Sequence, residues 1–265
     1  MNIVVAIKQV PDSTEVKINP ETKTLMREGA GTQINPFDLY ALEEAVRIKE
    51  RRAKEGLETK VTVITMGPPQ AESAVKEAIS LGADDGVILC DRAFAGSDTW
   101  CTSYAVACGC KKLGADLVIC GQQAIDGDTG QVGPGVAVHL AWAQAAYGAE
   151  IRDLTDKKLT IKRLVEDGYE VCEVSLPAVI TVVKEINEPR TPSLRGKMAA
   201  KKYTPVIWTA DDVEADKEKL GLNGSPTRVV KVMTPPKRTG GDKIEGETDE
   251  LAAALFDTFK KLEVI

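Results

Sequence analysis

Short apolar runs alternate with amphipathic segments along the first 140 residues of the chain. The runs, such as NIVVAI and GVILC, are apolar at nearly every position, whereas the segments between them place apolar residues three or four positions apart. The first pattern is typical of strands buried on both faces of a parallel sheet, and the second is typical of helices that cover such a sheet. We therefore expect an α/β fold, a parallel twisted sheet with helices on both faces. The predicted strands are 2–7, 61–65, 86–90 and 117–120, and the predicted helices are 37–54, 71–81, 97–113 and one that begins near 131.

The pattern changes after the fourth helix. The tripeptide Glu166-Asp167-Gly168 is a hairpin signal, and short turns of this kind join antiparallel strands. We expect these added strands either to extend the same sheet or to form a small antiparallel layer beside it. They are predicted at 147–154, 159–166, 169–174 and 179–183.

The regular alternation is lost beyond the last predicted strand. Residues 187–202 form a basic stretch that contains proline, and residues 235–248 form a linker rich in proline and glycine. The segment 251–262 is a predicted amphipathic helix with three large apolar residues on one side, Leu255, Phe259 and Leu262. This C-terminal arm is expected either to embrace a partner, which we favour, or to pack on its own chain.

The composition is that of a folded protein with an acidic balance. Among 265 residues, 34 are Lys or Arg and 40 are Asp or Glu, so the net charge is −6, and the isoelectric point is about 5.1. Proteins that bind nucleic acid present a basic face, so nucleic acid is not expected as a partner. No apolar run approaches the roughly 20 residues of a membrane-spanning helix, and the N-terminus does not resemble a signal peptide. We expect a cytoplasmic protein that binds no membrane.

Side chains that usually carry catalysis or bind metals are sparse. The six cysteines include no Cys-x-x-Cys pair, and Cys101, Ala105 and Cys108 share a helical face, which favours small buried thiols over metal ligands. His139 is the single histidine, and no Gly-x-Ser-x-Gly motif is present, so hydrolase chemistry is not expected. The sequence therefore predicts no catalytic residue and no metal site.

Ligands of an open parallel sheet bind beyond the carboxyl ends of its strands, and the loop 121–134 is the most informative of these regions. Its glycines allow the backbone to approach a ligand closely, Thr129 and Gln131 add uncharged donors, and the following helix directs its amides toward the loop. This combination suits a phosphate. Asp126 and Asp128 would repel a phosphate, so we expect them to cap the helix or to bind ribose hydroxyls. A long turn with helix caps explains the same spacing equally well, and neither the G-x-G-x-x-G motif nor the P-loop motif occurs.

Six segments stand out in unbroken order along the chain. They are VVAIKQVPD (4–12), NPFDLYALEEAVRIKE (35–50), TMGPPQAE (65–72), GQQAIDGDTGQVGP (121–134), LPAVITV (176–182) and EPRTPSLRGKM (188–198). Together they closely resemble the β subunit of electron transfer flavoproteins, from residue 1 to about 235. The resemblance implies an adenine-nucleotide-α-hydrolase-like fold and an obligate heterodimer with an α subunit that carries a shuttling FAD.

The resemblance also implies a division of the chain and a nucleotide site. It implies a nucleotide-binding α/β domain at 1–186, a partner-recognition loop at 187–202, and a C-terminal arm and helix at 203–265 that contact the α subunit. The family's nucleotide contacts fall on strand-end loops, at Ala6, Asn35, Pro36, Phe37, Asp38, Met66, Gly121, Gln122, Gln123, Ala124, Ile125, Asp126, Gly127, Asp128, Thr129, Gly130, Gln131 and Val132.

The family's partner-recognition loop falls on residues 188–198, with its apolar anchor at Leu194. In the family this anchor enters a hydrophobic pocket on an acyl-CoA dehydrogenase-like partner. The alternative is a leucine packed on its own loop. Because Leu194 lies in a basic stretch between Pro192 and Arg195, we favour the anchor.

Family members hold either AMP or a second FAD in the nucleotide site. The housekeeping type binds AMP and tends to carry an acidic residue at the position of Gly127, with Gln-Thr-Gly-Gln in place of residues 131–134. This chain instead resembles the electron-bifurcating type, in the segment 126–129 and in Val132-Gly133-Pro134. The missing side chain at Gly127 also leaves room for a dinucleotide. We therefore expect FAD, with AMP as the alternative.

Two functions remain open at this point. In the first, FAD in this subunit accepts two electrons from NADH. One electron then passes to ferredoxin or flavodoxin, and the other passes through the α-subunit FAD to the dehydrogenase. In the second, AMP is structural, and the chain supports the α subunit and docks the dehydrogenase. NADH oxidation is expected only in the α–β complex, and the flavin rather than a side chain carries the chemistry.

Overall fold

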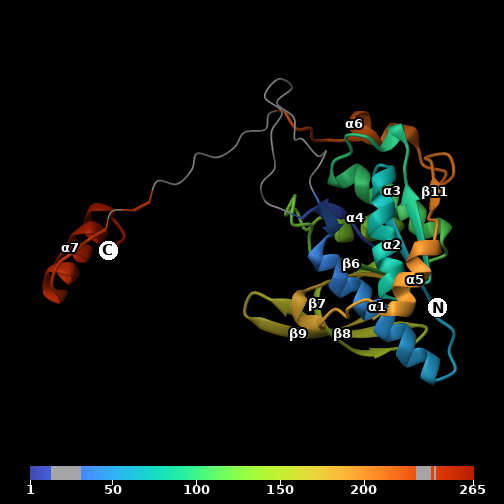
Figure 1. Ribbon diagram of the computed structural model, residues 1–265, viewed down its shortest axis with the longest axis horizontal. Coiled ribbons are helices and arrows are strands. Elements are labelled where there is room, and N and C mark those ends of the chain that lie inside the picture. The colour runs from blue at the N-terminus through green and yellow to red at the C-terminus, as the bar shows by residue number, and fades with distance from the viewer. Residues whose placement is uncertain (13–30, 231–239, 242) are drawn as a thin grey trace. The chain divides into compact units, whose positions relative to one another are not determined.

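The computed structural model describes residues 1–12, 31–230, 240–241 and 243–265 (Figure 1). The chain divides into two units, Met1–Val230 and Lys231–Ile265, which are described separately. The greater part of the proline- and glycine-rich linker predicted at 235–248 is described, but residues 235–239 and 242 lie outside the described residues.

A nine-stranded sheet forms the centre of the first unit. Its strand order is β11-β5-β4-β1-β6-β10-β7-β8-β9. The strands from β11 to β7 in this order are parallel, and β8 and β9 run antiparallel at one end. The expected α/β fold with a mostly parallel sheet is therefore confirmed. The strands are β1 Asn2–Ala6, β4 Lys60–Met66, β5 Asp85–Leu89, β6 Leu117–Gly121, β7 Ala143–Leu154, β8 Lys158–Val165, β9 Gly168–Ser175, β10 Ala178–Val182 and β11 Val206–Trp208.

Helices cover both faces of this sheet, as Figure 1 shows. Alternate side chains of β1 point to opposite faces, so Ile3 and Val5 belong to the core under α1 and α2, whereas Val4 belongs to the core under α3 and α4. Strands buried on both sides need apolar residues at every position, which explains the continuous apolar runs. The four helices are α1 Pro36–Lys54, α2 Glu72–Leu81, α3 Thr99–Lys112 and α4 Val132–Leu140.

The later strands extend the same sheet. At one end of it, β8 pairs antiparallel with both β7 and β9. The strand β10 inserts between β6 and β7 and is parallel to both. The helix α4 packs closely on β10, because a Cβ atom at Gly133 would overlap the side-chain methyl of Thr181. The glycine at 133 therefore allows the helix that follows the loop 121–131 to lie flat on the sheet.

Several elements were not expected from the sequence. A separate two-stranded antiparallel sheet pairs β2 (Gln9–Pro11) with β3 (Thr32–Ile34). The helix α5 (Leu194–Lys202) lies within the predicted recognition loop 187–202, and β11 adds an edge strand after it. The alternation of helix and strand therefore continues beyond residue 187. Short helices occur at η1 Pro69–Ala71, η2 Arg92–Phe94, η3 Lys184–Ile186, η4 Lys217–Lys219 and α6 Gly221–Gly224.

The described part of the second unit contains the helix α7 (Thr248–Lys261). Glu247 and Glu250 form a capping box at its start: the side chain of each residue accepts a hydrogen bond from the backbone amide of the other. The predicted amphipathic helix is confirmed, and it begins earlier than the apolar pattern indicates because the capping box adds a turn. Its apolar side chains are exposed, including Leu255, Phe259 and Leu262. Among the described residues, no helix combines the length and the apolar character that crossing a bilayer requires.

Candidate functional site

The loop 121–131 follows β6 and is held by residues from two other strand-end regions. Asn35, which precedes α1, donates from Nδ2 to the carbonyl oxygen of Gln123 (2.8 Å) and accepts from the amide of Ile125 at Oδ1 (3.1 Å). The side chain of Asn35 is buried, and its amide oxygen and amide nitrogen both bond to the backbone of this loop. Asn35 thus fixes the conformation of the loop backbone at Gln123 and Ile125.

Lys8, just beyond the end of β1, makes the second connection to this loop. Its ammonium lies 2.6 Å from Oδ1 and 2.7 Å from Oδ2 of Asp126. Asp128 accepts a hydrogen bond from Nε2 of Gln123 (2.9 Å) and has a left-handed backbone conformation, with φ of 50°. Of the two roles expected for Asp126 and Asp128, capping of the following helix is wrong, because the N-cap of α4 is Gln131 and no side chain caps it. Binding of ribose hydroxyls stays a prediction. In the structure, Asp126 forms an ion pair with Lys8, and Asp128 accepts a hydrogen bond from Gln123.

Asp38 anchors the start of α1 beneath the site. Its carboxylate accepts a hydrogen bond from the amide of Lys8 (2.8 Å), and the residue is buried. Burial raises the pKa of Asp38 to about 7, although hydrogen bonds from Asn35, Lys8 and Gly121 oppose the rise. A Cβ atom at Gly121 would overlap the Asp38 carboxylate, so the end of β6 approaches α1 this closely only with glycine. Asp38 therefore joins the β1 and β6 ends to α1.

The backbone between Thr129 and Gly133 presents unused donors. In the part of the chain that the structure describes, the amides of residues 129–133 have no protein acceptor. Gly130 has φ of +62°, a conformation that favours glycine, and it turns the chain into α4. A Cβ atom at Gly127 would meet nothing within 4 Å, so the loop is open beside it. Free amides at a helix start beside open space are suited to an anionic group such as phosphate.

The remaining predicted contacts lie at the ends of β1 and β4, at the starts of α1 and α4, and in the loop itself. Ala6, Met66 and Val132 stand at the ends of β1 and β4 and at the start of α4, and their side chains pack against the same core cluster. Pro36 and Phe37 form the first turn of α1, whose backbone adjoins Gly121. Gln122 and Ala124 are half-buried in the loop, and Ile125 is exposed at 42%.

One residue of the site was missed by the sequence argument. Thr99, the first residue of α3, donates from Oγ1 to Oε1 of Gln131 (2.8 Å) and so orients the N-cap of α4. Thr99 follows β5 in a loop-to-helix transition capped by Asp98. The rule that strand-end loops face the ligand could have included it.

The thiols that share a face of α3 lie in the core. Cys101 and Ala105 are completely buried, and Cys108 is half-buried. Burial raises the pKa of the Cys108 thiol, which disfavours the reactive thiolate. The described residues bring together no three side chains that could hold a metal ion.

Leu194 occupies an exposed position away from this loop. It is the first residue of α5, its exposed fraction is 78%, and Met198 one turn later is 56% exposed. The two side chains line a shallow apolar depression together with Ala199 and the stems of Arg195 and Lys202. Leu194 is not packed on its own loop, so that alternative is wrong.

Comparison with known proteins identifies the family. The model of the electron transfer flavoprotein domain matches residues 22–213. An electron transfer flavoprotein subunit beta from Thermoanaerobacterium thermosaccharolyticum is 48% identical, with all of both chains covered. The caffeyl-CoA reductase-Etf complex subunit CarD from Acetobacterium woodii is 46% identical over all of both chains, and the protein FixA from Azorhizobium caulinodans is 43% identical over 99% of this chain and 96% of its own. The chain belongs to the electron transfer flavoprotein β subunit family.

Proposed function

We propose that this β subunit binds FAD on the loop 121–132 and that its heterodimer with an α subunit oxidises NADH. The electrons then pass to ferredoxin or flavodoxin and, through the α subunit, to an acyl-CoA dehydrogenase-like enzyme. The observation that carries the proposal is that the amides of residues 129–133, which have no acceptor among the described residues, lie next to open space beside Gly127. The amides suit the phosphates, and the open space suits a dinucleotide larger than AMP.

The residues of the chain act as a binding frame. Residues 129–133 would hold the phosphates, Asn35 and Lys8 keep the loop in shape, and Asp38 holds the strand ends together. Ion pairing to Lys8 reduces the repulsion that Asp126 would otherwise exert on a bound phosphate. Bound flavin supplies the acceptor for a hydride and the means to release electrons singly, so no side chain of this subunit needs to act as an acid or a base.

The dehydrogenase is proposed to dock on α5. Leu194 and Met198 form an exposed apolar surface surrounded by basic side chains, which is typical of an interface anchor. The relative CarD is named as part of a complex with caffeyl-CoA reductase, which supports a partner that acts on a CoA thioester.

A substitution at Gly127 tests the nucleotide proposal. Gly127→Glu puts a carboxylate into the open space and should remove FAD from this subunit while the α-subunit FAD remains. Gly240→Glu is the matched control, because it makes the same change at another open glycine outside the loop. Nucleotides are extracted from the purified heterodimers and separated by chromatography. Equal FAD content in the Gly127→Glu variant and the control would overturn the proposal.

A substitution at Leu194 tests the docking proposal. Leu194→Ala should weaken binding to an acyl-CoA dehydrogenase by roughly 2 kcal/mol, with flavin content unchanged. Leu57→Ala removes a leucine that is 40% exposed in the loop after α1 and is the control. Equal binding by both variants in surface plasmon resonance would exclude α5 as the docking face.

A further inference from the structure

The segment that leads into α5 is tied to one face of α1. Arg190 is the centre of this contact: its Nε lies 2.7 Å from Oε2 of Glu43, and its Nη1 and Nη2 lie 2.6 and 3.0 Å from the two carboxylate oxygens of Glu50. The amide of Arg190 also donates to Glu43 (3.2 Å). The guanidinium therefore bridges two carboxylates that are two turns apart on the helix.

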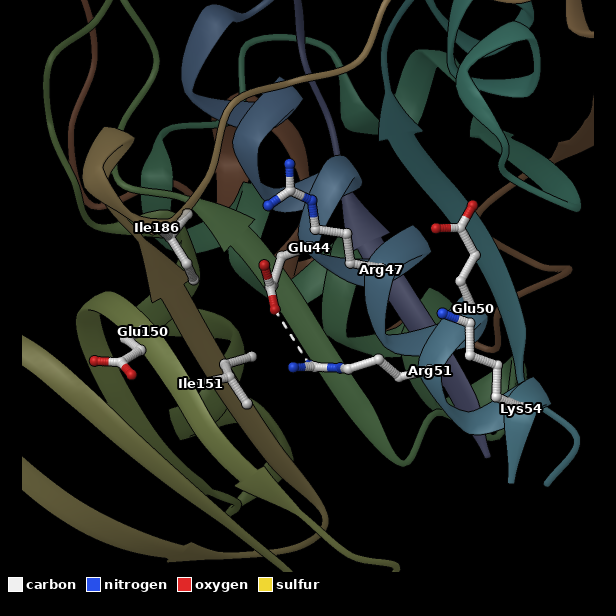
Figure 2. A pocket seen from close by; sticks show the side chains of 8 residues that line it. All are labelled: Glu44, Arg47, Glu50, Arg51, Lys54, Glu150, Ile151 and Ile186. Carbon is white, nitrogen blue, oxygen red and sulfur yellow. Dashed lines mark hydrogen bonds and ion pairs between the residues drawn. The ribbon is translucent and has the colours of Figure 1, made fainter. Parts of the chain in front are cut away.

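Two neighbours of Arg190 make further bonds to the same helix. Nδ2 of Asn187 donates to the carbonyl oxygen of Tyr40 (3.0 Å), and Nη2 of Arg47 donates to the carbonyl oxygen of Glu188 (2.9 Å). Figure 2 shows Glu44, Arg47, Glu50 and Arg51 along this stretch of α1, with Ile186 nearby. The residues Tyr40, Glu43, Glu44, Arg47 and Glu50 recur at helical spacing, so they lie on one face.

Glu43 is the buried carboxylate of this contact and pairs with two arginines. Its side chain is only 4% exposed, and Nε of Arg47 lies 2.5 Å from its Oε1. Burial alone would raise the pKa of Glu43, but the hydrogen bonds from Arg190 and Arg47 outweigh burial and hold the pKa below its usual range. A buried carboxylate with two guanidinium partners fixes the position of both.

The C-terminal end of α5 is also fixed. The hydroxyl of Tyr203, directly after α5, accepts a hydrogen bond from the amide of Gly86 at the start of β5 (2.6 Å). Inside α5, a Cβ atom at Gly196 would overlap the carbonyl oxygen of Ser80 in α2. The α5 helix is therefore held against α2 at its third residue and against β5 just after its C-terminal end, and Arg190 lies four residues before its first residue, Leu194.

We infer that Arg190 is a positioning residue for docking: its bridge from the 187–190 segment to Glu43 and Glu50 holds the start of α5 so that Leu194 is presented ready for a partner. This inference rests on the proposed docking of the dehydrogenase on α5. A preformed binding surface avoids the loss of apparent affinity that arises when only a fraction of the molecules is competent to bind.

The test compares variants of the purified heterodimer with a short-chain acyl-CoA dehydrogenase that binds the wild type measurably. Arg190→Gln should raise the Kd about tenfold, since the competent fraction falls to about one tenth. Glu43 keeps Arg47 in this variant, so α1 should still fold. Arg190→Lys should give an intermediate Kd, because a single ammonium cannot bridge both carboxylates. Arg152→Gln removes an arginine of β7 that pairs with Glu150, outside this contact, and it is the matched control with unchanged Kd.

Hydrogen–deuterium exchange separates positioning from general stabilisation. In Arg190→Gln, exchange should accelerate in residues 187–202 and remain unchanged elsewhere, with unchanged nucleotide content. Faster exchange throughout the chain together with loss of nucleotide would overturn the inference. An unchanged Kd in Arg190→Gln would also overturn it if Leu194→Ala still weakens docking. If Leu194→Ala binds normally as well, both the proposed docking face and this inference fail.

Discussion

The ammonium of Lys8 lies 2.6 Å from the carboxylate of Asp126, and this ion pair joins the end of β1 to the loop after β6. The two residues are 118 positions apart in the sequence. Their side chains are partly exposed, at 49% and 30%, so the pair contributes little to global stability. Its effect is expected in the geometry of the loop 121–131, the proposed nucleotide site.

Replacing Lys8 tests this effect. Lys8→Met should change the melting temperature little, because exposed ion pairs are worth at most about 1 kcal/mol. It should nonetheless accelerate nucleotide loss severalfold, because the negative charge of Asp126 is left without a partner beside the proposed phosphate site. Lys60→Met is the matched control, since Lys60 pairs with Asp85 at 3.0 Å with similar exposure. Nucleotide retained after gel filtration of the heterodimer is measured, and equal retention in the two variants would contradict the role of Lys8.

Thr129 is expected to contribute a donor to the phosphates. Thr129→Val keeps the shape of the side chain and removes one hydroxyl, which should cost on the order of 1 to 2 kcal/mol of nucleotide affinity. Thr160→Val, on β8, makes the same change outside the loop. Nucleotide binding is measured by calorimetry on heterodimer stripped of nucleotide. An affinity equal to that of the control would place the phosphates away from Thr129.

Asp38 should make stability depend on pH. Its pKa is about 7 in the folded chain and near 3.8 when the chain is unfolded. At a pH between these two pKa values, Asp38 is protonated in the folded chain and ionised in the unfolded chain. The stabilisation is therefore complete below about pH 4 and is lost as pH rises to 7, by as much as about 4 kcal/mol.

The Asp38→Asn variant isolates this contribution, because asparagine does not titrate. The melting temperature of the wild-type heterodimer should fall relative to that of the variant between pH 5 and 7, and the difference should level off above pH 8. Asp167→Asn, in the exposed turn between β8 and β9, should show no such trend. A constant difference between wild type and Asp38→Asn would show that Asp38 is ionised throughout.

Gly196 should be required for the placement of α5. Gly196→Ala forces the helix away from Ser80 on α2, an overpacking change that costs roughly 1 to 3 kcal/mol. Docking of the dehydrogenase should weaken as well, while nucleotide content is retained. Gly240→Ala, at a glycine with open space around it, is the control. Binding as tight as that of the control would show that the partner does not depend on where α5 lies.

The sequence predicted the elements whose apolar residues face the core. Residues such as Val4, Val5 and Val118 are buried in strands covered on both faces, so a simple apolar run marks them. The helix α5 was missed because its large apolar residues Leu194 and Met198 face outward, and only the small Ala200 belongs to the core. The strands β2, β3 and β11 have three residues each, too few to show a period.

The order of the strands was not readable from the pattern. An apolar run such as β10 fits any buried position, and its residues alone do not specify its place between β6 and β7. The loop 121–134 was proposed as the site because its glycines stand out in the sequence, and it remains a prediction. The bonds that shape it were not predicted, because the partners of Asn35 and Lys8 lie about 90 and 118 residues away and are set by the fold.

The stoichiometry of nucleotides in the purified heterodimer tests the central claim most directly. Acid extraction followed by chromatography should give two FAD per heterodimer, and NADH should bleach one of them when no dehydrogenase is present. One FAD and one AMP per heterodimer, with no bleaching by NADH, would contradict the claim and leave a β subunit whose nucleotide is structural.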